Sequence, residues 1–258
     1  AAATRGDAIT AADLAAGVRS TVEERLHGLA RRHTTRLGWD DVVLPDDTRE
    51  QIDLFVARVR HSFQVLERWG FARHLPGSGV AALFSGPPGT GKTMVASLIA
   101  QALGLELYRV DLSQIVSKWI GETEKQLELV FEAAETGHAV LLFDEADSLF
   151  AKRTEVKGAT ERYANLEVNF LLQRIESFSG VAILTTNMDG SIDPAFRRRL
   201  AAHIRFPHPE EDERLALWQR LLPRDAPRED DIDFEALAHD FRSEEHTSEL
   251  QSLRHRVC

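Results

Sequence analysis

The residues with the clearest chemistry form the segment Gly86-Pro87-Pro88-Gly89-Thr90-Gly91-Lys92-Thr93, which matches the pattern G-x-x-x-x-G-K-S/T in full. An apolar run at 80–84 precedes it, and Met94 to Leu103 follows with the apolar spacing of a helix. A glycine-rich loop between a strand and a helix directs backbone N–H groups to one point, where the helix dipole also attracts an anion. The segment therefore predicts a nucleotide site, in which Lys92 reaches the β- and γ-phosphates and the Thr93 hydroxyl binds Mg²⁺. A glycine turn with an unrelated lysine would leave the flanking strand and helix unexplained.

Two carboxylates follow a second apolar run, Ala139 to Phe143. A continuous apolar run is typical of a parallel strand covered on both faces, and open α/β sheets bind ligands at the carboxyl ends of such strands. We expect Asp144 to hold Mg²⁺ through water. We expect Glu145 to be the base, or the water-orienting group, for attack on the γ-phosphate.

An asparagine, Asn187, follows a third apolar run, Val181 to Thr186. In a nucleoside triphosphatase an amide at this position can orient the attacking water. The alternative is a turn-forming asparagine at a strand end, and that reading would be preferred if the other motifs were absent.

The rest of the chain alternates between strand and helix patterns, which indicates an α/β fold. We expect a mostly parallel five-stranded sheet sandwiched by helices, followed by the start of a small helical lid. The strands are predicted at 80–84, 105–110, 139–143, 181–186 and 203–206. Residues 8–33 are predicted to form one or two helices, and further helices are predicted at 48–69, 94–103, 163–178, 210–222 and 231–241, with another that follows the segment 117–125 and ends near Thr136.

Composition limits the classes of function. A net charge of −10 argues against a general binder of nucleic acids or anionic membranes, and no apolar run approaches the roughly 20 residues of a membrane span. The only cysteine is Cys258, so a reducing, cytoplasmic location is expected. Residues 242–258 resemble the in-frame translation of a sequencing adapter and are interpreted as a non-native tail. Ala1 in place of Met suggests a fragment.

The segments GPPGTGKT, KWIGETEK, LLFDEADSLF, TTN and IDPAFRRRL, in this order, resemble the AAA ATPases. The resemblance covers Leu37 to Phe241. It is strongest to the katanin and spastin group and to bacterial AAA proteins associated with contractile injection systems. On this reading the domains are a helical linker or tail of a preceding domain (1–36), the large α/β subdomain of a P-loop ATPase (37–206), a partial, truncated lid (207–241) and the tail (242–258).

The resemblance implies a ring, usually a hexamer, with ATP and Mg²⁺ bound between subunits. Arg198 and Arg199 are then the residues that reach the γ-phosphate of the neighbouring subunit. Lys118-Trp119-Ile120-Gly121 matches the family's pore loop, with Trp119 gripping a polypeptide, although a core tryptophan is the alternative. The segment 151–162 would be a second pore loop.

Two departures from the family concern the nucleotide. The loop WDDVVLPDD lacks the glycines of many relatives, so adenine contacts by Val42 and Val43 are an expectation from position alone. The lid is expected to end before the family's second sensor, which would weaken nucleotide binding or slow hydrolysis.

The function expected is Mg²⁺-dependent ATP hydrolysis coupled to remodelling or threading of protein substrates by a homo-oligomeric ring, without nucleic acid or membrane insertion. An ATP-gated scaffold with little turnover is the alternative, and a DNA-remodelling motor is disfavoured by the negative charge. The sequence does not reveal the protein substrate, the recruiting complex or any second ATPase domain upstream.

Overall fold

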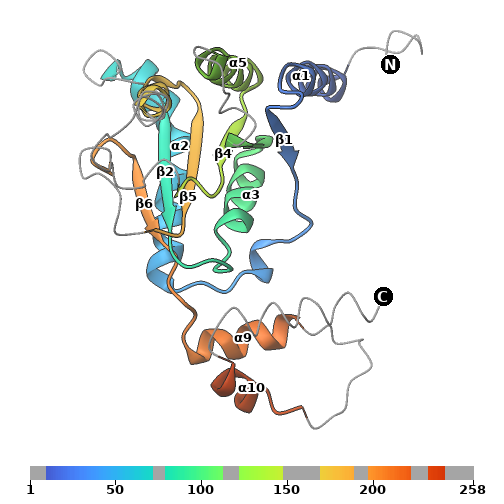
Figure 1. The fold of residues 1–258 in the computed structure, drawn as a ribbon, viewed down its shortest axis with the longest axis vertical. Coiled ribbons are helices and arrows are strands. Elements are labelled where there is room, and N and C mark those ends of the chain that lie inside the picture. Colours follow the sequence, from blue (N-terminus) through green and yellow to red (C-terminus); the bar gives the residue numbers. More distant parts are fainter. Residues whose placement is uncertain are drawn as a thin grey trace, which may run out of the picture.

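The computed structural model describes residues 10–71, 79–112, 122–147, 169–188, 197–221 and 232–241. A six-stranded sheet with the order β1-β3-β4-β5-β2-β6 forms its centre (Figure 1). All neighbouring strands are parallel except β1 and β3, which are antiparallel. The strands are β1 (Ala30–His33), β2 (Val80–Ser85), β3 (Leu107–Val110), β4 (Val140–Phe143), β5 (Val181–Thr186) and β6 (Ala202–Arg205). The predicted α/β class is confirmed, with one strand more than the five expected.

Helices cover both faces of the sheet because the central strands are apolar on both sides. Leu141 and Phe143 of β4 pack with α1 (Ala11–Arg25), α5 (Glu122–Gly137) and the helix at 169–177. Val140 and Leu142 point the other way, since successive strand side chains alternate. They pack with α2 (Asp46–Phe63) and α3 (Lys92–Leu103). Helix α3, which begins at the end of the phosphate-binding motif, therefore packs on the Val140 and Leu142 face of the sheet.

Other predicted elements form with small shifts. The ends of β2, β4, β5 and β6 lie within one residue of the predicted ends, while β3 begins two residues late. The predicted helix 48–69 begins at Asp46 and ends in a π-helical turn, η2 (Gln64–Arg68). A 3-10 turn, η1 (Trp39–Asp41), precedes it.

The N-terminal segment differs from the prediction. Helix α1 ends at Arg25, Gly28 takes a φ of +81°, and residues 30–33 form β1 instead of continuing the predicted helix. β1 pairs along the outer edge of β3, with Arg31 opposite Arg109. The main-chain hydrogen bonds offered by the free edge of β3 outweigh the weak strand propensity of Ala-Arg-Arg-His. The division of the chain into domains remains a prediction.

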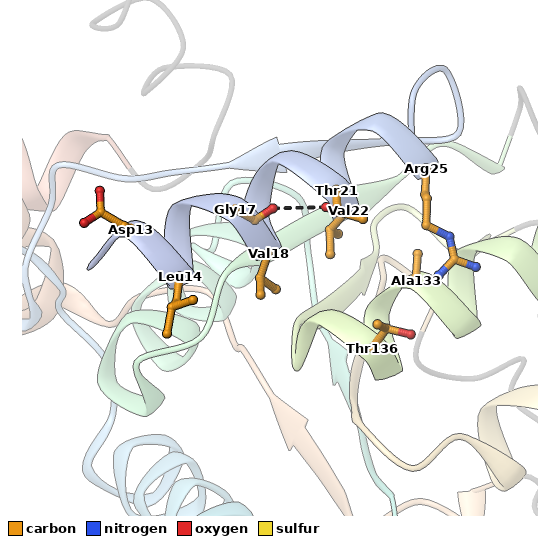
Figure 2. Close-up of a pocket in the computed structure, with 9 residues that line it drawn as sticks. All are labelled: Asp13, Leu14, Gly17, Val18, Thr21, Val22, Arg25, Ala133 and Thr136. Atoms are coloured by element: carbon orange, nitrogen blue, oxygen red, sulfur yellow. Dashed lines mark hydrogen bonds between the residues drawn. The ribbon is translucent and has the colours of Figure 1, made fainter. Parts of the chain in front are cut away.

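Helix α1 packs against α5 through its C-terminal half. Val22 is buried, and a Cβ on Gly137 of α5 would lie 2.4 Å from the Val22 side chain, so glycine permits this close approach. The other half leaves an open groove between the helices (Figure 2), in which Leu14 and Val18 remain 63% and 46% exposed.

Two helices beyond the sheet form the lid-like unit. α9 (Glu211–Leu221) and α10 (Phe234–Asp240) pack together below the sheet in the view of Figure 1. The Arg214 guanidinium donates to the carbonyl of Ala238 at 2.7 Å, and the rings of Trp218 and Phe241 meet edge to face at 5.8 Å. Within the described ranges, no helix is long and apolar enough to cross a membrane.

Candidate nucleotide site

The loop between β2 and α3 forms a concave backbone turn at the carboxyl edge of the sheet (Figure 1). Gly86, Gly89 and Gly91 have φ angles of 148°, 72° and 89°, a region that glycine adopts without steric cost. A Cβ on Gly86 would lie 2.0 Å from the carbonyl oxygen of Phe206, so no other residue fits there. Helix α3 begins at Lys92, and the first N–H groups of a helix have no partner within it. The turn and these N–H groups suit an anion such as a polyphosphate.

Lys92 extends over this loop. Its side chain is largely buried, and its Nζ donates to the carbonyls of Gly86 at 2.7 Å and Pro87 at 2.6 Å. The same ammonium donates to Oδ1 of Asn187 at 2.9 Å. These acceptors are uncharged oxygens, so a phosphate oxygen beside them would be a stronger partner for the ammonium.

Asp144 is held by three donors from three elements. Its Oδ1 accepts from the Thr93 hydroxyl at 3.0 Å and from the Thr185 hydroxyl at 2.6 Å. Its Oδ2 pairs with Nε of Arg109 at 3.0 Å, and only 8% of its side chain is exposed. The sequence predicted the closeness of Thr93 and Asp144. It assigned no role to Arg109 or to Thr185, which opens the quoted TTN segment; both come from strands that neighbour β4.

Glu145 stands next to this carboxylate with a positive φ of 53°, unusual for a residue other than glycine. Its backbone N–H donates to the Thr185 hydroxyl at 2.9 Å, and its side chain is exposed. Thr185 therefore donates its one proton to Asp144 and accepts from Glu145, which fixes the two acidic residues relative to each other. Such backbone strain persists where surrounding contacts hold it and is concentrated at functional sites.

Asn187 is oriented by a carboxylate from the segment after β4. Asp147 Oδ1 accepts from the backbone N–H of Asn187 at 2.8 Å, and Asp147 Oδ2 accepts from the side-chain amide at 3.4 Å. The hydroxyl of Thr186 also donates to Asp147. With its amide nitrogen turned to Asp147, Asn187 presents Oδ1 to Lys92. Asp147 lies in the DEAD sequence of residues 144–147, which was the one local signal for this role.

The donor set fits Mg²⁺ accompanied by nucleotide. The Thr93 hydroxyl and the Asp144 carboxylate are hard oxygen ligands, and Mg²⁺ commonly takes one or two such groups together with water and phosphate oxygens. Within the described part of the chain there is no group of three or more His, Cys, Asp or Glu residues that could form a metal site from protein alone.

The predicted arginines lie outside the phosphate loop, just before β6. Arg198 and Arg199 are both exposed, and Nη1 of Arg199 pairs with Oε1 of Glu176 at 2.8 Å. Glu176 belongs to the helix at 169–177. The arginines are therefore held at the surface, where a second molecule could meet them.

The two valines proposed for adenine differ in burial. Val42 is buried in the core with α2 and α3, while Val43 is half-buried. The carbonyl of Val42 accepts from Nη1 of Arg220 in α9 at 2.6 Å, so the lid-like unit is tied to this loop. The pore-loop residues Lys118, Trp119, Ile120 and Gly121, the 151–162 segment and the 242–258 tail lie outside the described residues.

Comparison with known proteins gives one family. Residues 82–208 match "ATPase family associated with various cellular activities (AAA)". The chain is 36% identical over 172 residues to the uncharacterized AAA family ATPase y4kL of Sinorhizobium fredii, covering 64% of this chain and 52% of that protein. It is 34% identical over 194 residues to the cell division cycle protein 48 homolog of Archaeoglobus fulgidus, covering 74% of this chain and 25% of that protein.

A third relative is the ATPase family AAA domain-containing protein FIGL1 of Arabidopsis thaliana, which is 37% identical over 155 residues. That alignment covers 58% of this chain and 22% of FIGL1. The chain thus spans about half or less of the length of the relatives it matches.

Proposed function

Because the chain belongs to the AAA ATPases, a family of ATP hydrolases, we propose that it hydrolyses ATP with Mg²⁺ as a ring of identical subunits. We further propose that the ring uses the cycle to remodel or thread protein substrates. The observation that supports hydrolysis best is the Thr185 hydroxyl, which joins Asp144 to the backbone of Glu145. A protein that only binds nucleotide has no need to fix a base beside the metal ligand.

Nucleotide binding rests on the loop and on Lys92. The N–H groups at the start of α3 and the Lys92 ammonium surround the β- and γ-phosphates, and Lys92 exchanges its carbonyl partners for phosphate oxygens. Thr93 would hold Mg²⁺ directly and Asp144 through water. When bound, Mg²⁺ supplies positive charge that stabilises the phosphates during transfer.

The hydrolytic step belongs to Glu145 and Asn187. Glu145 orients a water and accepts its proton as the water oxygen attacks the γ-phosphorus, while the bond to the β,γ-bridging oxygen breaks and ADP leaves. When Lys92 turns to the phosphates, it releases Oδ1 of Asn187, and that oxygen accepts from the same water. Thr185 and Asp147 touch neither water nor phosphate on this account; they are positioning residues that hold Glu145 and Asn187 in place.

Ring formation supplies the remaining charge. Arg198 and Arg199 reach the γ-phosphate bound by the neighbouring subunit and stabilise the transition state in trans, an effect worth about 10³- to 10⁵-fold in comparable enzymes. Their exposure supports this assignment. Trp119, flanked by Lys118, Ile120 and Gly121, grips the polypeptide in the central channel.

The test is the solution mass of a Glu145→Gln variant with and without ATP and Mg²⁺, beside the ATPase rate of the unchanged protein. The substitution keeps nucleotide binding and removes the proton acceptor, so we expect ATP-dependent assembly to about six subunits and a loss of turnover. Trp119→Ala should then assemble normally and lose work on protein substrates.

Two outcomes would contradict parts of this proposal. If Glu145→Gln binds ATP and stays monomeric, the trans role of Arg198 and Arg199 is wrong. If it assembles but the unchanged protein has no turnover above that of Glu145→Gln, an ATP-gated scaffold is the better account.

A further inference from the structure

Arg109 contacts the proposed magnesium ligand and has no role in the chemistry described above. It lies on β3, opposite Leu142 of β4 in the parallel ladder and therefore on the face of the sheet that α3 covers. Its Nε reaches Oδ2 of Asp144 at 3.0 Å. A cation already occupies the side of Asp144 that the two threonine hydroxyls leave open.

The two carboxylate oxygens of Asp144 have partners of different charge. Oδ1 receives the neutral hydroxyls of Thr93 and Thr185, whereas Oδ2 receives the guanidinium. A hydrated Mg²⁺ bound to this carboxylate would add two positive charges within a few ångströms of Arg109. Like charges this close repel each other, and the repulsion is weakly screened beside a largely buried carboxylate, so the two cations compete for Asp144.

The exposures of the two partners show which one can move. The Asp144 side chain is 8% exposed and held from three sides, while the Arg109 side chain is 47% exposed. With about half of its side chain in water, Arg109 can turn into solvent once Mg²⁺ replaces its positive charge beside Asp144. Asp144 is therefore fixed and Arg109 is the partner that can be displaced.

We propose that Arg109 is a built-in counter-cation of Asp144 that hydrated Mg²⁺ must displace, so that its charge sets the Mg²⁺ concentration at which nucleotide binds tightly. The inference rests on the proposed function, because it needs Asp144 to serve Mg²⁺. In the nucleotide-free protein the guanidinium neutralises a largely buried carboxylate. On magnesium binding it swings into solvent.

The experiment is a Mg²⁺ titration of the binding of a fluorescent N-methylanthraniloyl-ADP. At fixed nucleotide, Arg109→Gln should lower the Mg²⁺ concentration at half-saturation about three- to tenfold, and Arg109→Lys should stay near the unchanged protein. Arg31→Gln is the matched control. Arg31 is exposed and lies on β1, directly opposite Arg109. The substitution removes the same charge one strand further from Asp144, so the Mg²⁺ concentration at half-saturation should stay within about twofold of the unchanged protein.

An unchanged midpoint for Arg109→Gln overturns the proposal, as does a raised one, which would mean that Arg109 holds Asp144 in place for Mg²⁺. A shift shared equally by Arg31→Gln also overturns it, since the effect would then be general charge. Asp144→Asn separates this inference from the proposed function. If Mg²⁺ still strengthens binding in that variant as in the unchanged protein, the magnesium site itself is wrong. Melting curves without nucleotide identify any variant that fails to fold.

Discussion

The Thr185 side chain joins the two acidic residues of the site. Its buried hydroxyl donates to Asp144 and accepts from the N–H of Glu145, a residue at positive φ. We expect Thr185→Val, which keeps the shape, to lower the ATPase rate about 10- to 100-fold, because small misplacements of catalytic groups have effects of that size. Stability should fall by about 1–2 kcal/mol, the usual cost of an unsatisfied buried N–H.

Steady-state turnover, nucleotide affinity and urea denaturation measure these effects together. Thr185→Ser keeps the hydroxyl and should retain most of the rate. Equal turnover for the Val and Ser variants would show that this hydrogen-bonded junction does not position Glu145.

The hydroxyl of Tyr108, unlike that of Thr185, is not expected to stabilise the fold. Within the described residues this buried hydroxyl has no hydrogen-bond partner, and burial, reinforced by Glu23 and Glu106, raises the pKa of Tyr108. As the pH rises, the tyrosine of the unfolded chain ionises before that of the folded chain. The free energy of unfolding is therefore undiminished by this titration below about pH 10 and falls as the pH rises above it. Tyr108→Phe should therefore match or exceed the unchanged protein at pH 7, and its advantage should grow above pH 10.

Urea denaturation at pH 7 and at about pH 10.5 tests this expectation. A Tyr108→Phe variant that is clearly less stable at pH 7 would mean that the hydroxyl has a partner of value.

At the scale of elements, α1 and β1 both pack against the central sheet or the helices that cover it. Leu26, at the end of α1, is fully buried between helix and sheet, whereas Leu14 in the same helix is 63% exposed. Leu26→Ala should lower the free energy of unfolding by about 2–4 kcal/mol, the usual cost of a cavity in a core. Leu14→Ala should change it by less than about 0.5 kcal/mol.

Thermal and urea unfolding of both variants, monitored by circular dichroism, give the comparison. If the two leucine substitutions have equal, small effects, the packing of α1 does not stabilise the fold, and the segment behaves as the linker or tail of a preceding domain that the sequence suggested.

At the scale of the whole molecule, a hydrogen bond joins the lid-like unit to the segment that contains Val42 and Val43. Arg220 of α9 donates to the carbonyl of Val42 at 2.6 Å. Arg220→Gln should weaken ATP binding about three- to tenfold, because the loop that we propose for adenine loses its tie to α9, while the sheet stays intact. Calorimetric titration with ATP measures the affinity. Arg36→Gln is the control, because Arg36 is an exposed arginine that precedes the segment with Val42.

An ATP affinity that is the same in both variants would place adenine recognition elsewhere in the chain. A large drop in melting temperature for Arg220→Gln alone would instead indicate that the contact stabilises the fold.

The sequence by itself determined the features that depend on local order. Gly86, Gly91, Lys92 and Thr93 lie within one short segment, so the motif can be read from the sequence directly. Apolar runs of five or six residues predicted the three central strands β2, β4 and β5, because these strands are buried on both faces. Asp144 and Glu145 follow one of those strands. The phosphate loop and the acidic pair could therefore be predicted from the order of residues alone.

Tertiary structure alone decided the contacts that adjust this site. Thr185 and Arg109 reach Asp144 because β5 and β3 lie on either side of β4, an order that no local pattern encodes. β1 forms since the edge of β3 offers unpaired main-chain groups, although its residues have little strand propensity. Local propensity and motif spacing act over a few residues, whereas these contacts join residues 35 to 80 positions apart and exist only once the sheet is assembled.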